Sequence, residues 1–132
     1  MPEQSNAKLV QQAYQVFKEG QIESFLNLLS KDVLWVLPEM PNVPFAGTWN
    51  CRDGVAQFFS RMREVQDVEE FEPEEFIAQG NKVVVLGRFT MRIKVTGARS
   101  AWAHVWTIQD GVVTAVREYV DTLAVSRAHG PQ

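Results

Sequence analysis

Cysteine and histidine are scarce in this sequence of 132 residues, which has one cysteine, Cys51, and two histidines, His104 and His129. A single cysteine excludes an internal disulfide and every metal motif built from several cysteines. We expect Cys51 to be an ordinary loop thiol, because no histidine lies near it in sequence. A two-histidine metal site is not expected either, since His129 belongs to a terminal RAHGPQ segment that we expect to be mobile.

An excess of basic charge and a long hydrophobic run are also missing. The formal net charge is −3, which argues against a nucleic-acid partner. No apolar run approaches the roughly 20 residues needed to span a bilayer, and the start MPEQSNAKLV has no basic and apolar regions like those of a signal peptide. We therefore expect no membrane partner, a cytoplasmic location, and one globular domain over residues 1–132.

Helical spacing of apolar residues predicts three helices in the first half of the chain. They lie between Ser5 and Gly20, between Ile22 and Leu29, and between Gly54 and Met62. The segment DVLWVLP before the third helix predicts a strand that Pro38 ends. The next segment, PEMPNVPFAGTWN, contains three prolines, and we expect it to fold over the core or to form the rim of a pocket.

The second half of the chain predicts strands. Seven of the twelve residues from Glu64 to Glu75 are acidic, which is typical of a solvated loop or edge strand, although an acidic binding surface is the alternative. NKVVVLGRFTMRIKVTG predicts a half-buried strand, EEFIAQG allows another, and two more are joined by the turn dipeptide Asp110-Gly111. The pattern predicts an α+β fold with helices laid against one mostly antiparallel sheet.

The last two strands predict a face that mixes aromatic and polar side chains. If Asp110-Gly111 is the whole loop, Gln109 faces Val112 and the register follows from that pair. The facing pairs are then Trp106 with Ala115, His104 with Arg117, Trp102 with Tyr119, and Ser100 with Asp121. An apolar wall with a few polar groups is the composition of a ligand site. The opposite face is typical of a surface that packs against another sheet or subunit.

Two interpretations of that polar face remain open. His104 and Asp121 would lie about 13 Å apart at ~3.3 Å per residue, which suits the two ends of a multi-ring ligand unless a bulge brings them closer. The alternative is structural: His104 is a satisfied core or interface residue, and Arg117 and Asp121 bond to neighbours at the end of the sheet. Tyr119 and the tryptophans are then core residues.

The whole pattern resembles a known family. YQVFKEGQIESFLNLLSKDVLWVLP, PFAGTWNCRDGVAQFF and AWAHVWTIQDGVVTAVREYVDT are similar to segments of SnoaL-like polyketide cyclases and ketosteroid isomerase-related proteins, in the nuclear transport factor 2-like superfamily. The resemblance runs from about Ala7 to Ala128. It implies a cone-shaped fold, in which a strongly curved, mostly antiparallel sheet wraps around the three N-terminal helices, and a homodimer formed through the sheet backs.

The resemblance also implies a site. Asp121 and His104 match the acid/base aspartate and the histidine of the polyketide cyclases, whereas Leu37 occupies the position of the strand-one carboxylate base of the ketosteroid isomerase. The predicted catalytic residues are therefore Asp121 and His104. The predicted substrate-binding residues are Trp35, Leu37, Phe45, Phe58, Phe89, Trp102, Trp106, Arg117 and Tyr119.

Two functions follow from these expectations. The first is a cofactor-independent isomerase, cyclase or lyase that acts on a small-to-medium apolar carbonyl compound in the cone. Asp121 would take a proton next to the carbonyl, His104 would donate to the enolate oxygen, and Arg117 could hold a substrate carboxylate. The second is a module without catalytic activity that binds a hydrophobic ligand or only dimerises. The missing strand-one carboxylate favours the second function.

Overall fold

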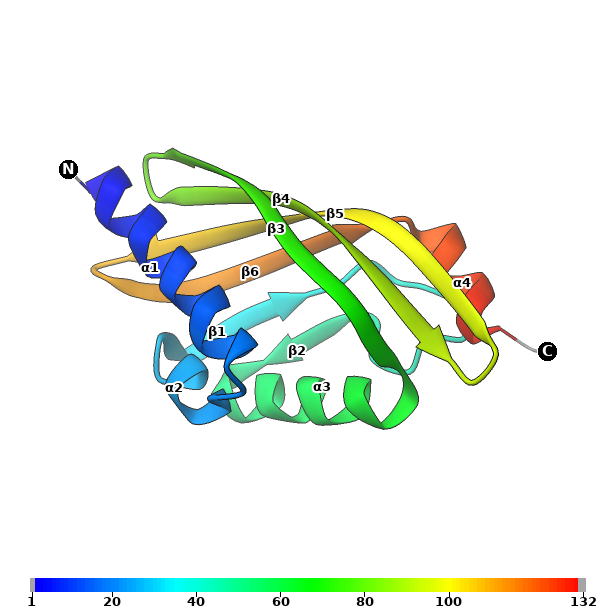
Figure 1. Ribbon diagram of the computed structural model, residues 1–132. Coiled ribbons are helices and arrows are strands. Elements are labelled where there is room, and N and C mark those ends of the chain that lie inside the picture. The colour runs from blue at the N-terminus through cyan, green and yellow to red at the C-terminus, as the bar shows by residue number, and fades with distance from the viewer. Residues whose placement is uncertain (1, 131–132) are drawn as a thin grey trace.

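A single curved sheet of six strands organises the chain, and a computed structural model describes it for residues 2–130 (Figure 1). The elements, in chain order, are α1 (Pro2–Lys18), α2 (Ile22–Leu26), β1 (Leu29–Val36), β2 (Thr48–Asn50), α3 (Cys51–Val65), β3 (Asp67–Gln79), β4 (Lys82–Ile93), β5 (Thr96–Gln109), β6 (Val112–Val120) and α4 (Thr122–His129).

The strands are ordered β2-β1-β6-β5-β4-β3 across the sheet. Only β1 and β6 run parallel, and every other neighbouring pair is antiparallel. Helices α1 and α3 pack against the sheet from the same side, as Figure 1 shows. The predicted α+β fold, a curved and mostly antiparallel sheet around three helices from the first half of the chain, is confirmed.

The predicted helices and the last hairpin form where the sequence places them, although their ends differ. Helix α1 begins at Pro2, where a proline loses no helical hydrogen bond, rather than at Ser5. Helix α3 begins three residues before Gly54, at Cys51. The turn Asp110-Gly111 has positive φ angles of 51° and 78°, as a two-residue hairpin of type I′ requires.

Three elements extend beyond the expected pattern. The acidic segment is part of the 13-residue edge strand β3, one of the two structures predicted for it. Residues 48–50 form β2, a strand too short to show any periodicity. The terminal segment expected to be mobile contributes His129 to α4, so that expectation is wrong within residues 2–130.

The register of the β5–β6 hairpin differs from the prediction by one residue. Gln109 faces Val112 and Ile108 faces Val113 as expected, but an irregularity between Thr107 and Ile108 shifts every later pair. His104 consequently faces Glu118 instead of Arg117. Because side chains alternate along a strand, this shift moves the side chains of β6 from Ala115 onward to the opposite face.

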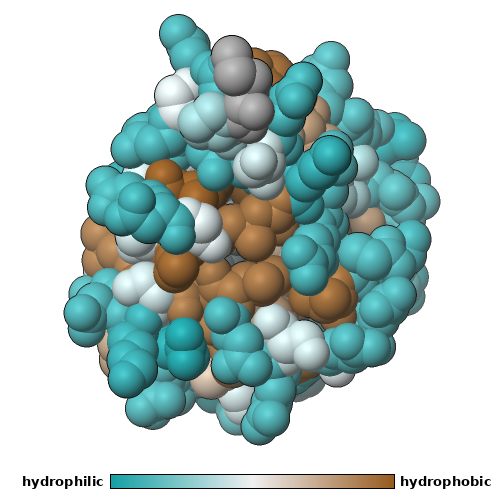
Figure 2. Space-filling view, turned by 90° about the vertical axis from the view of Figure 1, so that its left-hand side faces the viewer, coloured by the Kyte–Doolittle hydropathy of each residue, from teal (hydrophilic) through white to brown (hydrophobic). Residues whose placement is uncertain are grey.

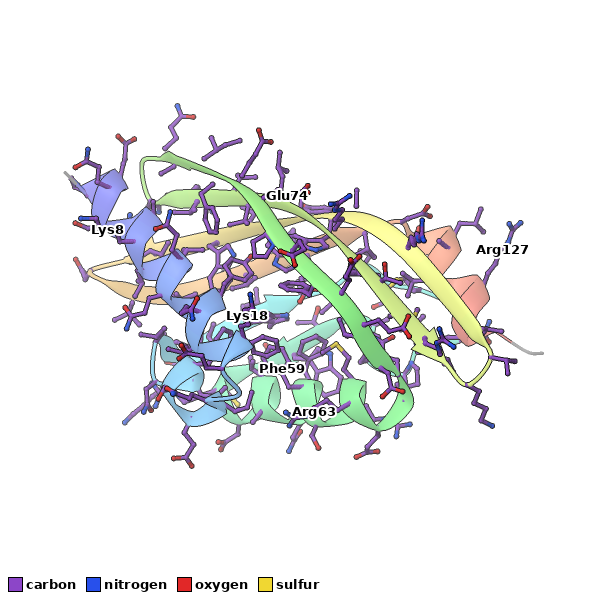
Figure 3. All side chains as sticks on the ribbon, viewed as in Figure 1. Lys8, Lys18, Phe59, Arg63, Glu74 and Arg127 are labelled. Carbon is purple, nitrogen blue, oxygen red and sulfur yellow. The ribbon has the colours of Figure 1, made fainter. Side chains whose placement is uncertain are left out.

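The core lies between the helices and the inner face of the sheet. Figure 3 shows aromatic rings crowded in this space, while the labelled side chains of Lys8 and Arg127 point away from it. The fully buried large side chains include Trp106 on β5 and Phe58 on α3. No helix within residues 2–130 is long and apolar enough to cross a membrane.

Candidate functional site

A cavity of about 530 Å³ lies between α1, α3 and the inner face of the sheet. Its wall is mostly aromatic and aliphatic, with a few polar side chains. The lining residues include Phe17, Phe25, Trp35, Leu37, Met40, Phe45, Phe58, Phe59, Met62, Phe71, Phe89, Trp106, Val120 and Val125. In Figure 2, hydrophobic side chains gather in a hollow at one end of the molecule, surrounded by hydrophilic ones.

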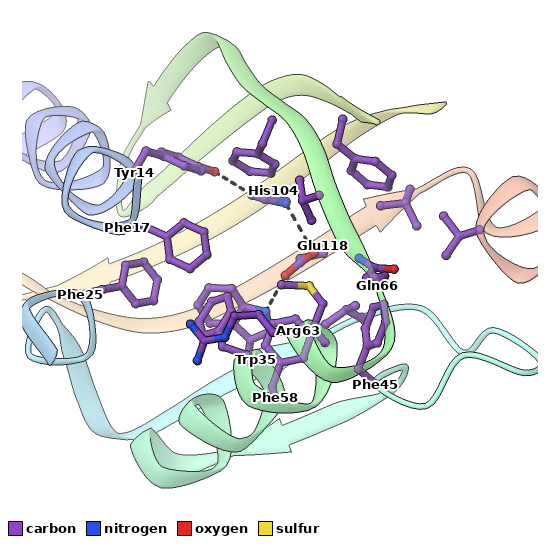
Figure 4. A pocket seen from close by; sticks show the side chains of 18 of the residues that line it. Tyr14, Phe17, Phe25, Trp35, Phe45, Phe58, Arg63, Gln66, His104 and Glu118 are labelled. Carbon is purple, nitrogen blue, oxygen red and sulfur yellow. Dashed lines mark hydrogen bonds and ion pairs between the residues drawn. The ribbon is translucent and has the colours of Figure 1, made fainter. Parts of the chain in front are cut away.

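Three polar side chains meet on this apolar wall. The hydroxyl of Tyr14 on α1 lies 2.7 Å from Nδ1 of His104 on β5, and the other ring nitrogen, Nε2, lies 3.5 Å from Oε1 of Glu118 on β6. Figure 4 shows the three side chains in a row. We call Tyr14, His104 and Glu118 the polar triad. His104 is only 6% exposed, so its contacts are shielded from water.

Two tryptophans complete the hydrogen bonds of the triad. Trp106 Nε1 donates to the Tyr14 oxygen at 3.0 Å, and Trp35 Nε1 donates to Glu118 Oε2 at 2.6 Å. An indole N–H can only donate, so both contacts have a fixed direction. The bond from Trp35 is short and fixes the position of the Glu118 carboxylate.

The protonation of His104 decides where the Tyr14 hydrogen points. When the imidazole carries a proton on Nε2 alone, Nδ1 is an acceptor and the Tyr14 hydroxyl donates to it. When both nitrogens are protonated, Nδ1 donates to the Tyr14 oxygen instead. The tyrosine hydrogen is then free to point into the cavity, because that oxygen accepts from both His104 and Trp106.

The Tyr14 hydroxyl keeps its proton well above neutral pH. Burial raises the pKa of Tyr14 and is the largest effect, the hydrogen bond from Trp106 lowers it by less, and the negative charge of Glu118 adds a still smaller increase. Tyr14 is therefore a hydrogen-bond donor in the cavity rather than an acid that gives up its proton.

The elements that carry the triad follow from the sequence pattern. Tyr14 lies one turn from Val10 on the face of α1 that packs against the sheet. Alternation along β5 puts His104 on the inner face with Trp102 and Trp106. The register shift in the hairpin brings Glu118 to the inner face of β6 beside them.

Most of the residues predicted for the site lie on the cavity wall. These are His104, Trp35, Leu37, Phe45, Phe58, Phe89 and Trp106. Trp102 is buried but lies behind the wall, stacked on His104. Arg117 and Tyr119 were expected in the cavity, and that expectation is wrong: both are exposed on the sheet back because the hairpin register is shifted by one residue.

Asp121 does not face the cavity either. Its carboxylate caps helix α4, since Oδ1 accepts from the backbone nitrogen of Ala124 at 3.0 Å, and the residue is exposed. The expected arrangement, with His104 and Asp121 at opposite ends of one site, is therefore wrong. The carboxylate that lies beside His104 in the cavity belongs to Glu118.

Sequence reasoning missed Tyr14 and Glu118. The helical spacing around Val10, Ala13 and Phe17 was a usable signal, because it puts Tyr14 at the edge of the buried face of α1. Glu118 carried no such signal: an unshifted hairpin places it on the sheet back. Glu118 would have been found only by foreseeing the bulge.

A second polar group closes one end of the cavity. Nε2 of His129 on α4 lies 2.8 Å from Oε1 of Gln66, and the ring of His129 packs edge-on against Phe45. Gln66, Phe45 and Val125 of α4 all line the cavity. Burial lowers the pKa of His129, which favours its neutral form there. Helix α4 thus forms part of the cavity end.

The described residues offer no group of side chains that could bind a metal ion in this cavity. Among residues 2–130, no three His, Cys, Asp or Glu side chains are arranged to hold a metal ion. Cys51 is exposed at the start of α3.

Residues 10–116 match the SnoaL-like domain family. That match covers most of the chain. The protein belongs to the SnoaL-like domain family. The resemblance expected from the sequence is confirmed.

Solved structures support the assignment to the SnoaL-like family. An NTF2-like protein from Burkholderia xenovorans LB400 is 31% identical, with a TM-score of 0.87 over 97% of this chain and 98% of that one. TerC, which was co-crystallised with polyporic acid, is 30% identical, with a TM-score of 0.86 over 95% and 98% of the two chains.

More distant relatives share the fold alone. Bal32a, from a soil-derived mobile gene cassette, is 18% identical and has a TM-score of 0.86 over 98% of this chain and 100% of that one. Comparison with curated proteins gives no match. The SnoaL-like fold carries many activities, so the reaction has to be argued from the cavity.

We predict that Tyr14→Phe lowers the free energy of unfolding by about 2 kcal/mol, because buried donors or acceptors left without a partner cost about that much. The substitution leaves His104 Nδ1 and Trp106 Nε1 without the tyrosine oxygen. Urea denaturation measures the change. Tyr119→Phe is the matched control, since Tyr119 is 49% exposed, and it should leave stability unchanged. Equal stability of the two variants would contradict the bonding described for Tyr14.

Asp121→Ala should lower the unfolding free energy by about 1 kcal/mol, the usual loss when a helix cap is removed. Ligand affinity of the cavity should stay within about twofold, because the Asp121 side chain lies outside it. Denaturation and tryptophan fluorescence titration measure the two effects. A large loss of ligand affinity with unchanged stability would contradict this position and would mean that Asp121 belongs to the binding site.

Proposed function

We propose that this protein is a cofactor-independent acid-base enzyme of the isomerase, cyclase or lyase type, whose substrate is an apolar carbonyl compound bound in the cavity. The observation that carries the proposal is the polar triad, in which a carboxylate, an imidazole and a phenol converge on a wall that is mostly apolar. Membership of the SnoaL-like family is consistent with it.

Glu118 is the base in this proposal. Its Oε2 is occupied by the short bond from Trp35, whereas Oε1 has only the long 3.5 Å contact with His104. Oε1 is therefore the oxygen that is available to take a proton, and Glu118 lines the cavity. His104 contacts Glu118 through one ring nitrogen and Tyr14 through the other. It therefore connects the base, Glu118, with the hydrogen-bond donor, Tyr14. Glu118 takes the role that the sequence suggested for Asp121.

The first step is the removal of a proton next to the carbonyl. Glu118 Oε1 takes the proton, the C–H electron pair forms the C=C bond of an enolate, and the carbonyl π electrons move onto oxygen. With His104 protonated, the Tyr14 oxygen accepts from His104 and Trp106 while its own hydrogen points to the enolate oxygen. Two bonds accepted by a hydroxyl strengthen the one it donates.

The second step depends on the substrate. Return of the proton from Glu118 to a different carbon isomerises the compound. Attack by the enolate carbon on a second carbonyl of the same molecule instead forms a new C–C bond and closes a ring. The π electrons of that carbonyl move onto its oxygen, and this alkoxide takes the proton from Glu118. Tyr14 retains its proton throughout, in agreement with its raised pKa.

The proposed substrate is a multi-ring aromatic or alicyclic molecule. The cavity volume of about 530 Å³ is within the range of small-molecule sites. Its walls present many aromatic faces, and flat rings stack well on such faces. TerC, co-crystallised with polyporic acid, is the relative that makes a compound of this kind a reasonable starting point.

A ligand-binding module without catalysis is the second candidate. It is favoured by the contacts of the triad, since Tyr14 bonds to His104, Trp35 bonds to Glu118, and Glu118 lies near His104. A cavity that only holds a ligand needs no more than this. The two candidates differ in whether Glu118 exchanges a proton with the ligand.

We also propose that the protein forms a homodimer through the sheet back. Leu86, Ala103 and Tyr119 stand side by side there on β4, β5 and β6. Tyr119 and Leu34 of the same face are exposed large apolar residues, which are typical of an interface. The proposed partner is a second copy of this chain.

The proton-transfer step can be tested with 2-tetralone, a two-ring ketone with acidic C–H bonds next to its carbonyl. We expect the protein to catalyse hydrogen-deuterium exchange at those carbons in D₂O, measured by NMR. Glu118→Gln should slow exchange at least about 100-fold, because a positioned base contributes about that much. Affinity measured by tryptophan fluorescence should change little, since glutamine still accepts from Trp35.

The control for this test is Glu70→Gln, which makes the same change on the exposed edge strand β3 and should leave exchange unaffected. Binding of 2-tetralone without exchange in the parent protein would favour the binding module. Full exchange in Glu118→Gln would remove Glu118 from the mechanism.

The proposed homodimer can be tested with a substitution that introduces a charged side chain on the sheet back. Ala103→Arg should convert a dimer to a monomer in analytical ultracentrifugation, because it puts an unpaired charge at the centre of the proposed interface. Val95→Arg is the control, since Val95 is fully exposed in the β4–β5 turn, away from that face. A parent protein that is monomeric at high micromolar concentration would contradict the proposal.

A further inference from the structure

The indole of Trp102 covers one face of the His104 imidazole. The two rings are stacked with centroids 4.0 Å apart and planes 20° apart, the closest ring contact among residues 2–130. Trp102 is 3% exposed and does not line the cavity, whereas His104 does. Phe71 of β3 stacks on Trp102 at 4.9 Å and 10°, so the indole is held in turn by a second ring.

The hydrogen bonds of His104 do not fix its ring by themselves. The bond with Tyr14 at 2.7 Å is strong, but it holds only one edge of the ring. The contact between Nε2 and Glu118 at 3.5 Å is too long to prevent that motion. The second side-chain torsion of histidine is broad, so packing has to define the plane.

The neighbouring strand β4 leaves space for the indole of Trp102 at a glycine. Gly87 of β4 faces Trp102 across the sheet, and a side-chain carbon at Gly87 would collide with ring carbons of the indole and with the Glu72 carbonyl oxygen. Only glycine allows the large ring to lie flat at this point.

The indole contributes stacking rather than a hydrogen bond. Trp102 Nε1 is buried and has no hydrogen-bond partner in the described part of the chain. A buried N–H without a partner carries an energetic cost, so an advantage of the large aromatic face has to offset it. That face also attracts a charged imidazole, which is the form of His104 that frees the Tyr14 hydrogen.

We propose that Trp102 is a positioning residue: by stacking on His104 it holds the imidazole plane so that Nδ1 faces Tyr14 and Nε2 faces Glu118 at the same time. Trp102 does not touch the substrate. This proposal rests on the proposed function for its effect on turnover, but the position of the ring can be measured without any ligand.

The test compares Trp102→Phe with Trp102→Leu. Phenylalanine keeps an aromatic face and removes no hydrogen bond, whereas leucine removes the stack. Trp49→Leu is the matched control, because Trp49 is a partly buried tryptophan with no ring contact to His104. Trp102→Met replaces the leucine variant if that variant does not fold, and thermal denaturation reports folding in every case.

The first readout is the downfield proton NMR signal of the hydrogen-bonded imidazole N–H, assigned by its loss in His104→Gln. The parent protein, Trp102→Phe and Trp49→Leu should show it, and Trp102→Leu should lose it through exchange with water. A signal that persists unchanged in a folded Trp102→Leu or Trp102→Met variant would overturn the proposal.

The second readout is the exchange of 2-tetralone at saturating concentration. Trp102→Leu should slow it about tenfold with little change in affinity, and Trp102→Phe should restore at least a third of the parent rate. Similar slowing by Trp49→Leu would show a general loss of packing and would also overturn the proposal. The two proposals can fail separately. If Trp102→Leu loses the N–H signal but the parent protein does not exchange 2-tetralone, the role of Trp102 is upheld and only the proposed function is contradicted.

Discussion

The site depends on a shift of one residue in the last hairpin. Between Thr107 and Ile108 the pairing of β5 with β6 moves by one position, and from there on the two faces of β6 are exchanged. Glu118 thereby faces His104 inside the cavity, and Arg117 faces outward. Without the shift, a guanidinium would lie beside the imidazole, and the cavity would have no carboxylate beside His104.

The aromatic packing around the triad makes its chemistry distinctive. Indole N–H groups of Trp106 and Trp35 donate hydrogen bonds to Tyr14 and Glu118. The ring of Trp102 stacks on His104. Each of these contacts replaces water, so the charges and hydrogen bonds of the triad act in surroundings of low polarity. A carboxylate, an imidazole and a phenol in such a setting are suited to moving a proton from carbon while stabilising the enolate oxygen.

The sequence predicted the fold well and the site in part. Periodic patterns located α1, α2, α3, β4 and the Asp110-Gly111 turn, because these depend on local residue types, whereas α4 was not predicted. Alternation on β5 correctly grouped His104 with Trp106, since both lie on one strand. The partners from β6 were wrong, because a bulge follows from packing of the whole sheet and has no local signature. Tyr14 was missed for a related reason: only the folded chain brings α1 to His104, far along the sequence.

The most direct test of this account is the set of nuclear Overhauser contacts made by the His104 ring protons in the ligand-free protein. The account predicts contacts with the side-chain protons of Glu118 and none with those of Arg117, because only Glu118 shares the inner face with His104. Contacts with Arg117 in place of Glu118 would mean an unshifted hairpin and would contradict the proposed site.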